Sequence, residues 1–140
     1  MHEATKNTEK IEGYVYQVRR MTPVVGGYIW QRFMHAMWKA RQEAKVEETY
    51  VEETPEEKKL PLDVRVRGLC GVALMQLSFE DFNFVQREAL RMVSRLVDGL
   101  PIPITSDDGR WAFKEVAEEP MTVTKLVMEV LAFNLSGFLA

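Results

Sequence analysis

The chain has little cysteine and no long apolar run, and both shortages exclude classes of protein. Cys70 is the single cysteine among 140 residues, so no internal disulfide can form, and a reducing compartment is favoured over secretion. The first thirteen residues contain no apolar stretch, so we expect no signal peptide. No run approaches the roughly 18 apolar residues that a membrane span needs. We therefore expect a cytoplasmic protein that does not bind membranes.

Charge of one sign is not in excess either. The formal net charge is −3, whereas a nucleic-acid-binding protein carries a strongly basic face. We therefore expect no nucleic acid partner. Hydrophobic residues make up 46% of the chain and charged residues 28%, which is typical of a folded protein, and the length predicts a single domain over residues 1–140.

Residues that bind metals or perform catalysis are also scarce. A zinc site needs about four converging ligands, and the chain offers only His2, His35 and Cys70 beside its carboxylates. We find no pattern of nucleophile, base or phosphate-binding loop, so we expect no catalytic residue, no metal and no cofactor, and hence no enzyme. One enzymatic alternative stays open, in which four carboxylates surround a metal: Asp81, Glu88, Asp107 and Asp108.

What the chain does contain is a series of amphipathic segments. After a polar stretch over residues 1–12, which we expect to be a flexible tail, Tyr14, Tyr16 and Val18 alternate with other residues and predict a short N-terminal strand. Thr22 and Pro23 predict a helix start. The apolar residues of this helix recur at spacings of three and four: Ile29, Trp30, Phe33, Met34, Met37 and Trp38.

The rest of the chain predicts a linker, three further helices and a hairpin. Residues 47–59 carry six Glu around Pro55, which predicts an acidic linker within the domain. Helices are expected over residues 62–77, from Ser78 to the Asp98-Gly99 pair, and from Thr122 or Thr124 to near the chain end. The Asp108-Gly109 turn predicts a small β-hairpin over residues 102–116. The fold class is therefore mainly α (α+β), with about four helices, a short N-terminal strand and a small hairpin.

One helix face suggests protein binding. Met34, Met37 and Trp38 share a face of the first helix, and methionine is over-used on adaptable binding surfaces. Such a face either packs into the core or forms a groove for a partner helix. Periodicity does not decide between these two interpretations.

Three stretches of the chain resemble a known family. Residues 14–23 (YVYQVRRMTP) lead into residues 28–34 (YIWQRFM), and residues 126–139 (LVMEVLAFNLSGFL) close the chain after a short stretch containing Trp111 and Phe113. Together they cover about half of the chain and resemble the tail assembly chaperones of long-tailed bacteriophages. In that family a strand and an apolar helix open the domain and an apolar helix ends it.

The resemblance implies a function without catalysis. Such a chaperone binds the long, largely helical tape measure protein in the host cell cytoplasm, keeps it soluble, and helps to recruit the tail tube protein. We expect the partner-binding residues to be Met34, Met37, Trp38, Phe133 and Phe138, and exposed apolar surface would also permit a homo-oligomer. The alternative is a structural virion component, a neck, tail or baseplate adaptor that binds other virion proteins.

Overall fold

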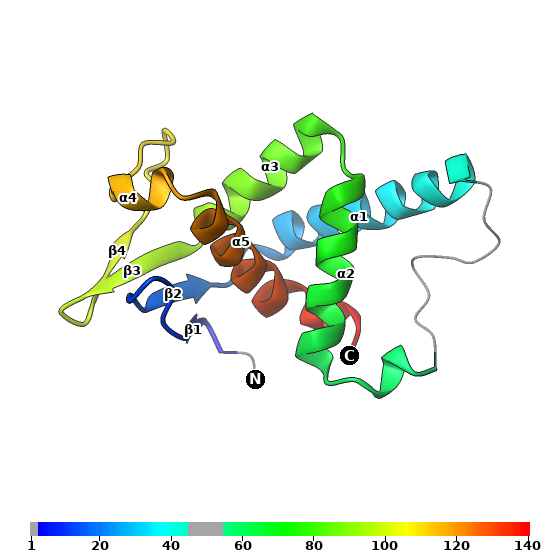
Figure 1. The fold of residues 1–140 in the computed structure, drawn as a ribbon, viewed down its shortest axis with the longest axis horizontal. Helices are drawn as coiled ribbons and strands as arrows, with labels where there is room; N and C mark the ends of the chain where they lie inside the picture. The colour runs from blue at the N-terminus through cyan, green and yellow to red at the C-terminus, as the bar shows by residue number, and fades with distance from the viewer. Residues whose placement is uncertain (1–2, 45–54) are drawn as a thin grey trace.

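Residues 3–44 and 55–140 are described by a computed structural model, in which a four-stranded antiparallel sheet lies at one end of a group of helices (Figure 1). The predicted α+β class is confirmed. The α-helices of the described residues are α1 (Pro23–Ala44), α2 (Leu62–Gln76), α3 (Phe79–Leu90), α4 (Lys114–Ala117) and α5 (Pro120–Leu135). Two short 3-10 helices are η1 (Glu57–Lys59) and η2 (Ser136–Phe138).

The sheet is formed by neighbouring strands that each pair antiparallel. Their order is β1 (Thr5–Asn7), β2 (Tyr16–Arg19), β3 (Val93–Val97) and β4 (Leu100–Pro103). β3 and β4 form a hairpin whose two-residue turn is Asp98-Gly99, with φ angles of 51° and 80°. Positive φ at both turn residues matches a type I′ turn, which the Asp-Gly pair favours. The fold therefore contains a small hairpin, as its predicted class does, but over residues 93–103 and around Asp98-Gly99, where a helix end was predicted.

The third helix is shorter than predicted, and the helix prediction is wrong for the residues that follow Leu90. The helix ends at Leu90, whereas its apolar pattern continues to the Asp98-Gly99 pair. Val93, Leu96 and Val97 do fit helical spacing. However, Val93 lies opposite Val18 of β2, and both side chains are fully buried. Pairing with β2 thus buries Val93, whereas Val97 near the hairpin turn remains 40% exposed.

The hairpin predicted over residues 102–116 is wrong in position. β4 ends at Pro103, and the Asp108-Gly109 turn is closed by an isolated bridge between Thr105 and Trp111. α4 then begins at Lys114. Asp108-Gly109 does lie in a turn, as predicted. The residues beyond it form a loop and one helical turn instead of a second strand.

The N-terminal segment differs in part from the tail predicted over residues 1–12. Thr5–Asn7 pair with β2 as the edge strand β1, and Thr8 and Ile11 are buried, so the tail prediction is wrong for this part of the segment. Of the acidic linker predicted over residues 47–59, residues 47–54 lie outside the described residues. The remaining five are exposed and end in η1.

The predicted helix starts agree closely with the structure. α1 begins at Pro23, and the Thr22 hydroxyl accepts a hydrogen bond from the Val25 N–H at 3.3 Å. The Ser78 hydroxyl caps α3 by accepting from the Asp81 N–H at 3.2 Å. α5 begins at Pro120, which suits the first turn of a helix, two residues before the predicted Thr122.

α5 forms the centre of the core. It packs against α2, α3, α4 and β2, and its side chains at Leu126, Val130, Leu131 and Leu135 are fully buried. By length and composition alone, Pro120–Phe138 is apolar enough to cross a membrane. Packing accounts for part of that apolarity, because 39% of the apolar span is buried inside the protein.

Both edges of the sheet are poor sites for adding a strand. In β4, Pro101 lies opposite Leu96 and Pro103 opposite Ser94. The Ile104 N–H donates to the Val93 carbonyl, so Ile104 points its backbone groups toward β3. Backbone direction alternates along a strand, and an N–H at position 101 or 103 would therefore point to the outer edge, away from β3. Proline has no N–H, and the outer edge of β4 therefore lacks donors there. The other edge, β1, is only three residues long and carries Lys6.

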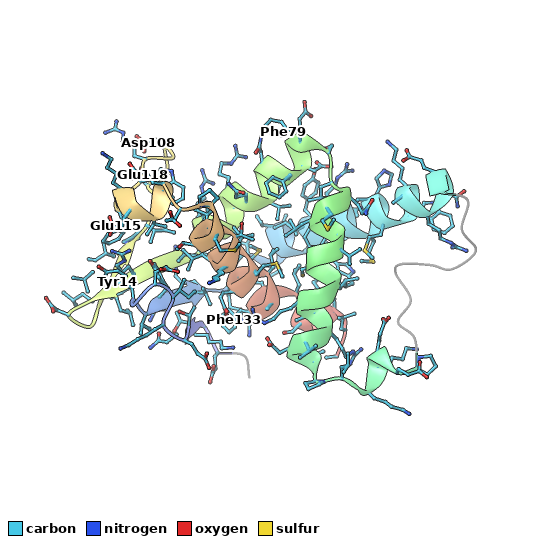
Figure 2. The ribbon with its side chains drawn as sticks, viewed as in Figure 1. Tyr14, Phe79, Asp108, Glu115, Glu118 and Phe133 are labelled. Carbon is cyan, nitrogen blue, oxygen red and sulfur yellow. The ribbon has the colours of Figure 1, made fainter. Side chains whose placement is uncertain are left out.

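One buried arginine fastens the sheet to α4. The Arg95 guanidinium lies 3.8 Å from the Tyr14 ring centroid and 4.1 Å from that of Phe113. It donates to the Tyr16 hydroxyl at 2.9 Å and to the Glu115 carboxylate at 2.7 Å. The hydrogen bond from Arg95 holds the pKa of Glu115 below its ordinary value. Tyr14 and Glu115 lie at the end of the molecule that holds the sheet, as Figure 2 shows.

Candidate partner-binding surface

Two of the five predicted contact residues pack inward. Met37 belongs to the stripe that also includes Ile29 and Phe33, at steps of four, and only 1% of it is exposed. Met34 is half-buried against the core. The stripe faces inward because α2, α3 and α5 pack against α1. Met37 is therefore not available to a partner in this conformation.

The three aromatic residues of that set lie in different surroundings. Phe133 is half-buried, with the Arg20 guanidinium 3.7 Å from its ring centroid. Phe138 stacks on Trp30 at 4.6 Å between centroids and remains half-exposed. Trp38 is half-exposed on α1. Of the predicted residues, Trp38 and Phe138 present the most accessible side chains.

A larger apolar surface lies on the outer side of α2. Met75 is 82% exposed, and Phe79, at the start of α3, is 80% exposed. Figure 2 shows Phe79 where α2 meets α3, away from the end that holds Tyr14 and Glu115. We call the outward residues of this helix the α2 face: Val64, Gly68, Gly71, Val72 and Met75.

The opposite side of α2 is ordinary core. Val66, Cys70 and Ala73 are fully buried, and the helix contacts α1 and α5. Burial raises the pKa of the Cys70 thiol to about 12, so this cysteine is a packed side chain and a poor nucleophile. A helix that is apolar all round is expected to be buried all round. Within the described residues, only one side of α2 is covered by the rest of the chain.

The two glycines of the α2 face leave open space beside the helix. A Cβ atom added to Gly68 or Gly71 would meet no atom within 4 Å. Glycine inside a helix costs roughly 1 kcal/mol relative to alanine. No close contact among the described residues requires a glycine at either position. Packing of the described residues therefore does not explain why the helix carries glycines that lower its stability.

Two arginines flank the α2 face on its two long sides. At 100° per residue, Arg65 lies on one side of the Val64–Gly68 line and Arg67 on the other. Arg67 donates to Asp63 at 2.8 Å and to Glu129 at 3.0 Å, and these hydrogen bonds raise its pKa. Arg65 donates to the Leu139 carbonyl at 3.2 Å. The charge of Arg67 is therefore balanced by two carboxylates, and both arginines are held in place by contacts with α5 or the C-terminal segment.

A polar hollow of about 600 Å³ lies beside the loop over residues 104–112. Arg19, Arg91 and Trp111 contribute to its lining. Arg91 pairs with Glu88 at 3.2 Å, and Arg19 donates to the Arg91 carbonyl at 2.6 Å. Arg91 also donates to the Asp107 carbonyl at 3.2 Å, and this hydrogen bond ties the loop to the end of α3.

The carboxylates named in the enzymatic alternative are separated. Asp81 accepts two hydrogen bonds from Arg32, at 2.5 and 3.0 Å, and joins α3 to α1. Glu88 pairs with Arg91, while Asp107 and Asp108 lie in the loop beyond β4. In the part of the chain that the structure describes, no three His, Cys, Asp or Glu side chains gather as a metal site would require.

The residues that sequence reasoning missed are Met75 and Phe79. The signal for Met75 was present, because α2 carries apolar residues on every side while its charged residues are confined to its first half. For Phe79 the only signal was its place directly after the capping Ser78, ahead of the periodic core positions.

Comparison with known proteins gives one finding at the level of a family. A family model described as phage tail assembly chaperone protein, TAC, matches residues 12–140. No curated protein and no solved structure matches the chain. The match includes every helix described above and the strands β2, β3 and β4.

Proposed function

Because the chain belongs to the family of phage tail assembly chaperone proteins, we propose that it binds the tape measure protein and keeps it soluble until the tail tube forms around it. This activity belongs to the cytoplasm of the host cell, where tails are assembled. The tail tube protein is a second partner, recruited to the complex. The protein acts by binding alone and uses no cofactor.

The observation that supports this proposal is the uncovered apolar surface of α2 and Phe79. A long helical protein without its tube exposes apolar stripes that would otherwise associate with one another. A chaperone that covers them needs apolar surface of its own on a rigid support. Met75 and Phe79 supply exposed, adaptable side chains, and α2 is held by its packing on α1 and α5.

Co-expression tests the proposal directly. The tape measure protein of the same phage is produced with and without this chain, and its soluble fraction is measured after centrifugation. We expect the soluble fraction to rise when the chain is present, and we expect a tagged chain to retain the tape measure protein on an affinity column. No rise and no retention would contradict the proposal.

Purified particles separate the chaperone from the structural alternative. A chaperone leaves before the tail matures, so mass spectrometry of finished particles should detect the tube protein but not this chain. Its presence at a fixed ratio to the tube protein would favour a neck, tail or baseplate component.

A further inference from the structure

We propose that the hairpin end of the sheet is a second protein-binding surface, and that its occupant is a partner helix whose apolar stripe is flanked by Lys or Arg. We call this surface the hairpin face, which is formed by four exposed apolar residues: Tyr14, Val97, Leu100 and Ile102. Figure 2 shows Tyr14 at the sheet end, away from Phe79. This inference therefore goes beyond the proposed binding of the tape measure protein and does not depend on it.

Strand register places the four side chains on one face of the sheet. In the β3–β4 hairpin, Val97 lies opposite Leu100, and Arg95 lies opposite Ile102. Side chains directly opposite each other on paired strands point to the same face, and so do side chains two residues apart on one strand. The Tyr14 ring joins this face, because its centroid lies 3.8 Å from the Arg95 guanidinium. The four residues therefore form one continuous apolar patch.

The helices cover this face of the sheet only in part. Nearer the middle of the sheet, Val18 and Val93 are fully buried, and α5 packs against β2. Beside them, Glu115 of α4 accepts a hydrogen bond from Arg95 at 2.7 Å. The exposed fraction then rises from 4% at Arg95 to 65% at Leu100. Figure 1 shows the turn between β3 and β4 projecting beyond α4, so one more helix beside α4 would continue the helical layer over the sheet.

Two turns that carry unpaired carboxylates border the hairpin face. Glu12-Gly13 forms the turn directly before Tyr14, and Asp98-Gly99 forms the turn between β3 and β4. Glu12 and Asp98 are both exposed. Within residues 3–44 and 55–140, neither carboxylate has a salt bridge or a side-chain hydrogen bond. Both charges are therefore available to a partner.

The net charge around the hairpin face is negative. Residues 9–14 and 97–100 contain three carboxylates and one ammonium, so their net charge is −2. The cations of the adjoining α4 region, Arg95 and Lys114, are already paired with carboxylates at 2.7 and 3.7 Å. Charged residues that flank an apolar surface select partners of opposite charge. The partner helix should therefore carry Lys or Arg beside its apolar stripe.

Two synthetic helical peptides test the proposal on the full chain. Each peptide has about 14 residues, which is about four helical turns, and carries one leucine stripe. Lysines flank the stripe in the first peptide and glutamates in the second, and calorimetry measures the binding of each. The variants are Leu100→Ser and Asp98→Asn, because Asn-Gly suits the same type I′ turn as Asp-Gly. Met75→Ser is the matched control, since Met75 is 82% exposed on α2, and circular dichroism confirms the helix content of every variant.

We expect the lysine peptide to bind the parent chain at least about tenfold more tightly than the glutamate peptide at low salt, because like charges repel. Leu100→Ser should weaken binding of the lysine peptide about tenfold, since it removes the most exposed side chain of the hairpin face. Asp98→Asn should weaken it about threefold at low salt and less at high salt, because exposed charges are screened. Met75→Ser should bind like the parent chain.

Three results would overturn the inference. The first is that neither peptide binds, or that both bind the parent chain equally. The second is that the lysine peptide binds Leu100→Ser as tightly as it binds the parent chain. The third is that the chain alone sediments as a dimer that Leu100→Ser converts to a monomer, because a second copy then covers the hairpin face. The tape measure protein is absent from this assay, so any of these results leaves the proposed function standing.

Discussion

Truncating the two most exposed apolar side chains near the α2–α3 junction should weaken partner binding without unfolding the chain. About four-fifths of Met75 and of Phe79 is exposed, at 82% and 80%. Replacing either residue by alanine therefore removes little packing, and surface changes of this kind usually alter the free energy of unfolding by less than about 0.5 kcal/mol. Alanine also suits both helical positions.

The loss of affinity follows from the area that a partner would cover. Burying a Phe or Met side chain contributes about 1.5–3 kcal/mol relative to leaving it exposed. Alanine keeps the Cβ, so we expect a loss of about 1–2 kcal/mol for each substitution. For the double variant Met75→Ala/Phe79→Ala this amounts to about 2–4 kcal/mol, or roughly a 30-fold to 700-fold increase in Kd.

Calorimetric titration against the tape measure protein measures this change. Leu100→Ala serves as the control, because it removes a similarly exposed side chain from the other end of the molecule. A double variant whose Kd stays within about threefold of the parent value, with unchanged helix content, would refute the reasoning.

Four further predictions concern the fold. Ser78→Ala should lower the free energy of unfolding by about 1 kcal/mol in urea titrations, because it removes the cap of α3; an unchanged midpoint would contradict this. Arg95→Ala should cost about 2–4 kcal/mol by the same assay, because it opens a cavity and leaves the buried Tyr16 hydroxyl without its partner. The pKa of Glu115 is held below its ordinary 4.5 by Arg95, so its contribution to stability is complete above that pH and is lost as the pH falls through the folded pKa. Glu115→Gln should accordingly flatten the fall in urea midpoint on acidification, and an unaltered acid profile would count against this pairing. Cys70, with its pKa raised to about 12 by burial, should resist a thiol reagent at neutral pH until urea unfolds the chain, and rapid labelling of the native chain would show that the site opens.

Much of the fold could be predicted because its helix signals are local. The Thr22-Pro23 start of α1 and the Ser78 cap of α3 involve residues within four positions of each other. The strand β3 could not be predicted in this way. Its apolar spacing is compatible with either a helix or a strand. The strand is favoured by a distant contact, because Val18, which lies 75 positions earlier, faces Val93 and both side chains are fully buried.

The candidate site was less accessible to sequence reasoning. Periodicity identifies which residues share a face, but not which face the rest of the chain covers. Met37 and Met75 are the same residue type on similar helices, yet one is fully packed and the other is exposed. The difference lies in where the neighbouring helices pack: α1 and α5 both contact α2 on its inner side, and the described residues leave its outer side uncovered.

The prolines of β4 have a consequence for how copies of this chain can associate. Misassembly by β-structure spreads when an open strand edge offers alternating donors and acceptors to the next chain. The outer edge of β4 has no N–H at Pro101 or Pro103, and β1 offers only a three-residue edge. Both edges of the sheet are thus poor templates for the addition of a further strand. Copies of the chain that collide are therefore poorly able to extend the sheet from one molecule into the next.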